Sequence, residues 1–156
     1  MSKAFIYVVT TLTRKYLQRT FRNVPTEWKE RLYFGPCKKP MRPRMRPGDW
    51  VVGISPGNGT VRRIVFVAQL EERITFADAY DRFPELRGPE GPIHVRPTNS
   101  IGRFPESCYQ HIPGANHETN WKADLKSRGL DAFFVCAERG NGWLGRWLGE
   151  SGPCYR

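Results

Sequence analysis

Long apolar runs and cysteine motifs are both missing from this chain. The apolar run nearest the start, Ala4 to Val9, is too short for a signal-peptide core or a membrane span. The four cysteines, at positions 37, 108, 136 and 154, form no C-x-x-C pair, and 156 residues can bury a core without disulfides. These absences predict one domain over residues 1–156, in the reducing cytoplasm, with no membrane partner.

Catalytic patterns are also missing. Paired carboxylates beside an apolar motif do not occur, and the Gly-x-Gly-x-x-Gly run over residues 140–145 lacks the βαβ unit and acidic partner of a dinucleotide site. Cys108-x-x-His111 with His117 matches no standard metal spacing and lacks an evident fourth ligand. We therefore predict no catalytic residue, metal or cofactor.

Acidic residues are scarce at the start of the chain. Residues 1–46 hold 12 Lys and Arg against 2 Asp and Glu, whereas the remainder holds 13 of each. The whole net charge of +10 therefore lies in the first 46 residues. Such an uneven distribution predicts one surface that faces a polyanion, because a charge that serves only solubility would be more evenly spread.

Strands and one short helix are expected, which gives an α+β class. Thr75 is predicted to cap a helix from Phe76 to about Phe83 that covers an open end of the sheet. β-Branched and aromatic content predicts a central strand at Ala4–Thr10, a hairpin of Trp50–Ser55 with Arg62–Leu70, a short strand at Ile93–Val95 and a buried strand at Leu130–Ala137.

Two longer segments are expected to be irregular. Residues 12–34 read as an excursion between strands, partly helical, with Thr26 as a helix cap before Glu27. The aromatic residues of this segment could stack on bases or could plug the core, and both interpretations stay open. Residues 99–120 are expected to form a long loop, of the kind that usually binds something or moves.

A turn and a basic run precede the strand that begins at Trp50. Pro47-Gly48 predicts a tight turn, with Asp49 as a carboxylate that fixes it. Prolines at 40, 43 and 47 should keep the preceding run extended, so that its cations follow a phosphate backbone. The residues predicted to contact phosphates are Lys38, Lys39, Arg42, Arg44 and Arg46.

Several of these motifs carry a resemblance to a known family. The order of Gly35-Pro36-Cys37-Lys38-Lys39-Pro40-Met41-Arg42, Gly48-Asp49-Trp50-Val51-Val52-Gly53, Ile64-Val65-Phe66-Val67-Ala68 and Ile74-Thr75-Phe76 resembles the nucleotide-modification-associated domains of bacteria and phages. It is similar, more distantly, to the EVE, ASCH and YTH members of the PUA-like superfamily. The resemblance covers about Phe5 to Phe83 and the final strand.

This resemblance implies a small, strongly bent mixed β-barrel with short helices at its rim and a pocket that receives a flipped, modified base. A flipped base needs apolar walls, fixed polar groups and cations for the flanking phosphates. Residues at strand ends and in loops beside the Gly48-Asp49 strand are the candidates for the pocket, with His94 as a possible contact to a base edge. The full set is Thr10, Cys37, Trp50, Ser55, Asn58 and His94, although the side chain of Trp50 favours the core and His94 could be structural.

The sequence therefore predicts a domain that binds nucleic acid and recognises a modified base, with DNA favoured and RNA possible. A nuclease or base-modifying enzyme is a possible partner. Two alternatives stay open: an enzyme that acts on a modified nucleotide through Cys37 or His94, and an RNA- or ribosome-associated domain that contacts only the backbone.

Overall fold

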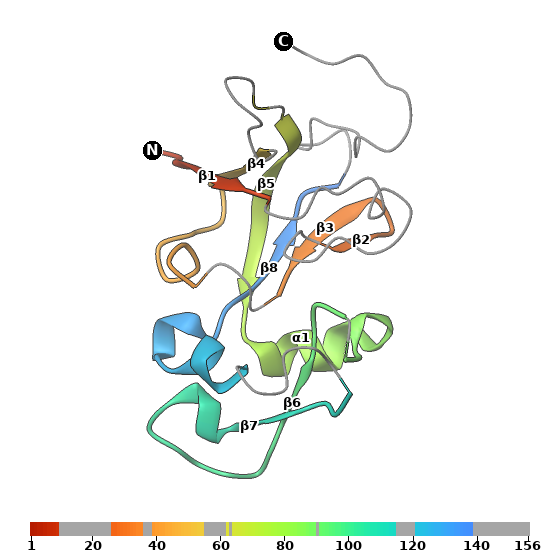
Figure 1. Ribbon diagram of the computed structural model, residues 1–156, viewed down its shortest axis with the longest axis vertical. Coiled ribbons are helices and arrows are strands. Elements are labelled where there is room, and N and C mark those ends of the chain that lie inside the picture. The colour runs from red at the N-terminus through yellow and green to blue at the C-terminus, as the bar shows by residue number, and fades with distance from the viewer. Residues whose placement is uncertain are drawn as a thin grey trace.

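A computed structural model describes residues 1–9, 26–35, 39–54, 62, 64–89, 91–114 and 121–138 (Figure 1). Within these residues the strands are β1 (Ala4–Val8), β2 (Thr26–Trp28), β3 (Arg31–Phe34), β4 (Trp50–Ile54), β5 (Ile64–Ile74), β6 (Val95–Pro97), β7 (Tyr109–His111) and β8 (Phe133–Cys136). The helical elements are α1 (Phe76–Arg82) and the short 3₁₀ helices η2 (Pro84–Leu86), η3 (Pro105–Ser107), η4 (Trp121–Leu125) and η5 (Arg128–Leu130). The predicted α+β class is confirmed.

Six of these strands form one mixed sheet in the order β1-β4-β5-β8-β3-β2. β1 runs parallel to β4, and the other neighbours are antiparallel. In the described part of the chain no pairing joins β1 to β2, so the sheet is open between its two ends. The expectation that Ala4–Thr10 forms a central strand is wrong, because β1 lies at one end of this order and leaves Ile6 exposed.

The long strand β5 connects the two halves of the sheet. Its first half pairs with β4 and its second half with β8, with an irregularity in register between Leu70 and Glu72. In Figure 1 it runs from β1 and β4 down to α1. The predicted hairpin of β4 with β5 is confirmed, and Phe66 of β5 packs so closely on Gly53 that any Cβ there would overlap its ring. Glycine is therefore required at this position.

A second hairpin, formed by β2 and β3, was not expected from the sequence. Thr26 begins a strand rather than capping a helix, and Trp28 pairs with Arg31 across a two-residue turn. Lys29 and Glu30 have φ of 46° and 59°, which is the geometry of a type I′ turn that matches the twist of the two strands. The helical interpretation of residues after Thr26 is wrong because this turn lacks the Gly or Asn that normally signals it.

The helix α1 covers the lower end of the sheet, as predicted (Figure 1). Thr75 caps it: its side chain accepts a hydrogen bond from the Asp78 N–H at 3.0 Å, and Asp78 accepts in return from the Thr75 N–H at 3.3 Å. Phe76 is fully buried and meets the ring of Phe133 edge-on, with centroids 5.8 Å apart. The final strand was predicted over Leu130–Ala137, and β8 occupies the fully buried centre of that range.

Beneath α1 lies a small ribbon of β6 and β7. The predicted strand at Ile93–Val95 begins two residues late, because Ile93 makes only an isolated bridge with Arg87 and β6 starts at Val95. β7 falls inside the segment that was expected to be irregular. The strand that pairs with β6 is therefore formed by a stretch of sequence with no clear alternation of apolar and polar residues.

Buried side chains form two clusters. The upper cluster contains Tyr7, Val9, Leu32, Phe34, Met45, Val51, Val65, Phe66, Ala68, Leu70, Ala132, Phe134 and Cys136. The lower cluster contains Tyr33, Phe76, Ala79, Leu86, Ile93, Val95, Tyr109, Leu125, Phe133 and Val135. Neighbouring residues of β8 therefore face different clusters, as the alternation of a strand requires.

Candidate functional site

The predicted turn before β4 is present and is held from both sides. Gly48 has a φ of 89°, and the N–H of Asp49 donates to the carbonyl of Arg46 at 3.1 Å. The Gly48 N–H donates to the Leu70 carbonyl at 2.7 Å, which ties the turn to β5. Pro47 and Gly48 thus occupy the central positions that favour a fixed φ and a positive φ.

Asp49 fixes this turn through its carboxylate, as the sequence predicted. One oxygen, Oδ2, accepts from the backbone N–H of Arg46 at 2.8 Å. The other, Oδ1, accepts from the backbone N–H of Lys3 at 2.9 Å, just before β1. The residue is only 5% exposed, so its charge is compensated by backbone donors rather than by solvent.

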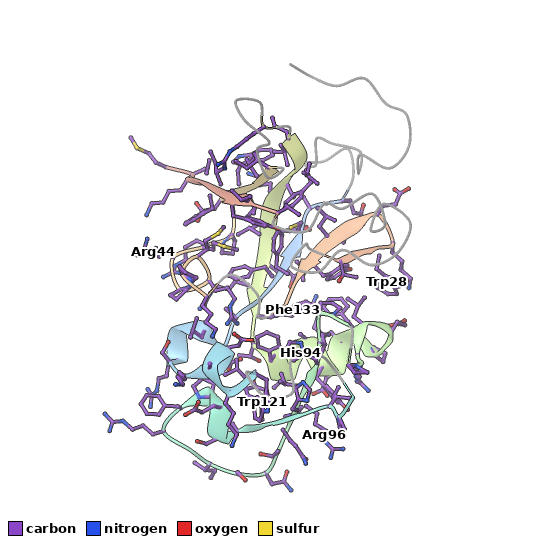
Figure 2. All side chains as sticks on the ribbon, in the orientation of Figure 1. Trp28, Arg44, His94, Arg96, Trp121 and Phe133 are labelled. Atoms are coloured by element: carbon purple, nitrogen blue, oxygen red, sulfur yellow. The ribbon has the colours of Figure 1, made fainter. Side chains whose placement is uncertain are left out.

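An open cavity of about 330 Å³ lies beside this turn, and we call it the basic cavity. Arg46 borders it with a restrained side chain, since its Nη1 donates to the Pro43 and Met45 carbonyls, each at 2.8 Å. Arg44 is exposed on the same loop and lies at the left of Figure 2. The lining residues are Met1, Ser2, Lys3, Arg44, Arg46, Pro47 and Asp49. The cavity therefore gathers three cationic side chains around one internally satisfied carboxylate.

The basic run is folded rather than extended, which corrects the expectation from its prolines. The Met41 carbonyl accepts from the N–H groups of Arg44 and Met45, at 2.9 and 3.1 Å. Met45 is buried in the upper cluster, whereas Arg44 and Arg46 are exposed, so this compact turn sends some side chains inward and others outward. Proline prevented a regular helix here, but it did not prevent a single helix-like turn.

Arg42, which was predicted to contact a phosphate, points inward instead of lining the basic cavity. It is 1% exposed, and its guanidinium donates to the carbonyls of Leu130 (2.6 Å) and Asp124. Lys39 is partly exposed and forms an ion pair with the Asp124 carboxylate at 3.0 Å. Of the predicted phosphate contacts, Arg44 and Arg46 are thus exposed at the basic cavity, while Lys38 lies outside the described residues.

The predicted base pocket is only partly described. Thr10, Cys37, Ser55 and Asn58 lie outside the described residues. Trp50 is half-buried at the start of β4, where its N–H donates to the Lys3 carbonyl at 2.8 Å.

His94 belongs to the opposite end of the molecule. It is 3% exposed, and its ring centroid lies 5.5 Å from that of His111, which in turn stacks on Trp121. Figure 2 places His94 and Trp121 in the lower half, whereas β4 lies near the top in the same orientation. The structure therefore does not bring His94 to Trp50, and the predicted contact of His94 with a base edge stays a prediction for a residue that is buried at the other end of the fold.

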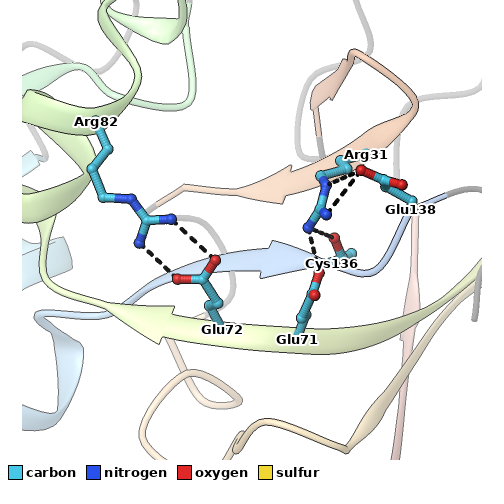
Figure 3. A network of polar contacts seen from close by, with 6 residues as sticks. All are labelled: Arg31, Glu71, Glu72, Arg82, Cys136 and Glu138. Carbon is cyan, nitrogen blue, oxygen red and sulfur yellow. Dashed lines mark hydrogen bonds and ion pairs between the residues drawn. The ribbon is translucent and has the colours of Figure 1, made fainter. Parts of the chain in front are cut away.

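A second open cavity, of about 350 Å³, lies on the other side of the turn, and we call it the mixed cavity. Arg31 of β3 donates to the carboxylates of Glu71 and Glu138, the latter at 3.0 Å (Figure 3). The lining residues are Arg31, Gly48, Gln69, Leu70, Glu71, Ala137 and Glu138. Gly48 borders the mixed cavity, while its two neighbours, Pro47 and Asp49, border the basic cavity. The turn therefore separates two openings of different charge.

Charge in the mixed cavity is organised around Arg31. Partial burial alone would lower the pKa of its guanidinium, but the hydrogen bonds to Glu138 and Glu71 outweigh that effect and raise the pKa. A positive charge is thus maintained between the two carboxylates. The sequence does not reveal this group, because Glu71 and Glu138 lie 40 and 107 residues from Arg31 along the chain. No local spacing could have indicated it.

In the parts of the chain that the structure describes, no three His, Cys, Asp or Glu side chains are placed to hold a metal ion. No helix among those residues is long and apolar enough to cross a membrane. No family model, no curated protein and no solved structure matches the chain.

Proposed function

We propose that this protein binds nucleic acid, that phosphates occupy the basic cavity, and that the domain recognises a modified base. The observation that carries the proposal is the convergence of Lys3, Arg44 and Arg46 on one open cavity. The carboxylate that borders this cavity, Asp49, already accepts two backbone hydrogen bonds. An anion that enters the cavity therefore meets cations without a competing exposed carboxylate.

Guanidinium groups suit this ligand class. Their planar array of N–H donors matches the oxygens of a phosphate, and each contact releases counterions from the nucleic acid. Arg46 is restrained by two carbonyls of its own loop, so little side-chain entropy remains to be lost on binding. The net charge of +10, which lies entirely in residues 1–46, supports the same ligand through long-range attraction.

The recognition of a modified base and the barrel architecture rest on the resemblance to PUA-like domains. Two features of the fold agree with the resemblance: the Gly48-Asp49 turn opens β4, and the next strand, β5, leads into the short helix α1. The choice between DNA and RNA follows the resemblance alone, which favours modified DNA. The proposed setting is the cytoplasm, with a nuclease or base-modifying enzyme as partner.

The test is a comparison of affinities for short DNA strands with and without a methylated or hydroxymethylated base. The double variant Arg44→Gln/Arg46→Gln should bind at least about tenfold more weakly, since each lost charge-assisted hydrogen bond costs about 1.5–3 kcal/mol. Arg96→Gln/Arg103→Gln is the matched control, because it removes the same charge at exposed sites on the ribbon of β6 and β7 and its loop, with Arg96 far from Arg44 in Figure 2. The control should change affinity by less than about twofold.

Two results would overturn parts of the proposal. Equal weakening by both double variants would show that binding follows total charge rather than the basic cavity. Equal affinity of the native chain for modified and unmodified strands would remove the modified base from the proposal and leave a domain that reads only the backbone.

A further inference from the structure

We propose that the mixed cavity is the subsite for a nucleobase that carries an exocyclic amino group, held while its phosphate lies in the basic cavity. One nucleotide would then straddle the turn at residues 47–49. This inference rests on the proposed function and deepens it, because it identifies which part of the surface reads the base.

The position of the cavity is the first argument. Pro47 and Asp49 border the basic cavity and Gly48, between them, borders the mixed cavity, so the two openings lie beside the same turn. A Cβ placed on Gly48 would find no atom within 4 Å, so the space beside this residue is open. A base can therefore approach the backbone closely at the point where its own phosphate would be bound.

The hydrogen-bonding character of the cavity is the second argument. Arg31 occupies one oxygen of Glu71 and one oxygen of Glu138, which leaves an acceptor oxygen on each carboxylate. The Gln69 amide nitrogen donates to the Gly48 carbonyl at 3.1 Å, which fixes the amide and leaves its oxygen as a third acceptor. The open positions of the cavity thus consist mainly of acceptors.

An acceptor-rich cavity selects a ligand that donates. The exocyclic amino groups of cytosine, adenine and guanine are donors, and carboxylates are established partners of the cytosine amino group. Thymine and uracil present carbonyl oxygens at the corresponding positions, which would face the carboxylates of Glu71 and Glu138 with like partial charge. The side chains of Leu70 and Ala137 supply apolar surface within the same lining. A volume of about 350 Å³ is at the small end of ligand pockets, which suits a single base.

Charge also orients the nucleotide across the turn. With Glu71 and Glu138 around one Arg31, the mixed cavity has a formal charge of −1 and repels a phosphate. The basic cavity attracts that phosphate through Lys3, Arg44 and Arg46. The two cavities therefore favour one orientation, with the base on the Gln69 side and the phosphate on the Arg46 side.

The experiment measures the affinities of short oligo-dC, oligo-dA and oligo-dT strands by fluorescence anisotropy at fixed salt. The native chain should prefer dC or dA over dT by at least about fivefold, the lower bound for one good base contact. Glu71→Gln/Glu138→Gln should reduce that ratio to near one, because each new amide places a donor where only an acceptor stood and so tolerates a thymine carbonyl.

A matched control is adjacent in the chain. Glu72 is held by Arg82 at 2.6 and 3.0 Å and does not border the mixed cavity (Figure 3), so Glu72→Gln should leave the ratio unchanged. The two target carboxylates are about half-exposed, with side-chain exposures of 47% and 55%, so their loss should cost little stability. The single variant Glu138→Gln, which leaves Glu71 on Arg31, provides a second test if the double variant does not fold.

The outcomes separate this inference from the function on which it rests. Salt-dependent binding without a preference for dC or dA over dT would overturn the base subsite and leave the basic cavity in place. A preference that survives in both Glu71→Gln/Glu138→Gln and Glu138→Gln would have the same consequence. An absence of salt-dependent binding to any strand would overturn both. A ratio that falls equally in Glu72→Gln would also overturn the subsite, because it would reflect a general loss of negative charge.

Discussion

The carboxylate of Asp49 accepts a hydrogen bond from the backbone N–H of Lys3 at 2.9 Å, and the two residues lie 46 positions apart in the sequence. Its other oxygen accepts the N–H of Arg46, so one buried side chain joins the start of β1 to the turn before β4. Lys3 and Arg46 are also two of the three cations at the basic cavity. The geometry of that cavity therefore depends on a residue that does not itself need to touch a ligand.

Replacement of Asp49 by Asn should destabilise the fold by about 1–2 kcal/mol, because an amide offers one acceptor oxygen and so loses one of the two partly buried hydrogen bonds to backbone donors. Urea denaturation of the variant gives the free energy of unfolding directly. Asp81→Asn, at an exposed position of α1, is the control and should change stability by less than about 0.5 kcal/mol. Equal stabilities of the two variants would contradict the role given to Asp49.

The cap of α1 should be worth about 1 kcal/mol. Thr75→Ala removes the oxygen that accepts the Asp78 N–H and should lower the free energy of unfolding by that amount. Thr75→Ser keeps the oxygen and should retain most of the stability. Thermal unfolding of the three chains compares them, and a Ser variant as weak as the Ala variant would show that the methyl group, rather than the cap, matters.

The same cap predicts a pH dependence. Hydrogen bonds from the Thr75 side chain and backbone hold the pKa of Asp78 below its ordinary value. Since the folded pKa is the lower one, this contribution to stability is present above the ordinary pKa of Asp and is lost as pH falls through the folded pKa. Titration of the Asp78 carboxyl carbon by NMR should give a midpoint below the ordinary value for an aspartate side chain. In Thr75→Ala the Asp78 midpoint should move upward, and an unmoved midpoint would contradict the assignment.

Gly53 should tolerate no side chain. An alanine Cβ would overlap the buried ring of Phe66, and overpacking of this kind costs about 1–3 kcal/mol. Chemical denaturation of Gly53→Ala tests this. The double variant Gly53→Ala/Phe66→Leu should lose less than the sum of the two single variants, because the smaller side chain makes room for the methyl group. Strict additivity would mean that the two positions do not meet.

Much of the sheet could be predicted from local sequence. The Pro47-Gly48 turn, the β4–β5 hairpin and the Thr75 cap each depend on a few adjacent residues whose preferences agree with the fold. The hairpin of β2 and β3 could not be predicted, because its turn uses Lys29 and Glu30 in a conformation that their side chains disfavour. Tertiary pairing of β3 with β8 prevailed over local preference there.

The candidate site was predictable where it depends on charge and hidden where it depends on distant contacts. Arg44 and Arg46 were identified from the density of cations in the basic run. Arg42 shares that pattern but is buried, because the loop turns it toward the Leu130 carbonyl. The mixed cavity depends on Arg31 meeting Glu71 and Glu138, and only the order of strands in the sheet brings these residues together.

The central claim is that phosphates occupy the basic cavity, and the dependence of affinity on salt tests it most directly. For single-stranded DNA, the logarithm of the binding constant should fall linearly with the logarithm of salt concentration, with a slope of about −0.7 for each phosphate contact. Arg44→Gln/Arg46→Gln should make the slope shallower by about 1.4, which corresponds to two lost contacts, while Arg96→Gln/Arg103→Gln should leave it unchanged. A native slope near zero, or a slope that Arg44→Gln/Arg46→Gln does not alter, would contradict the claim.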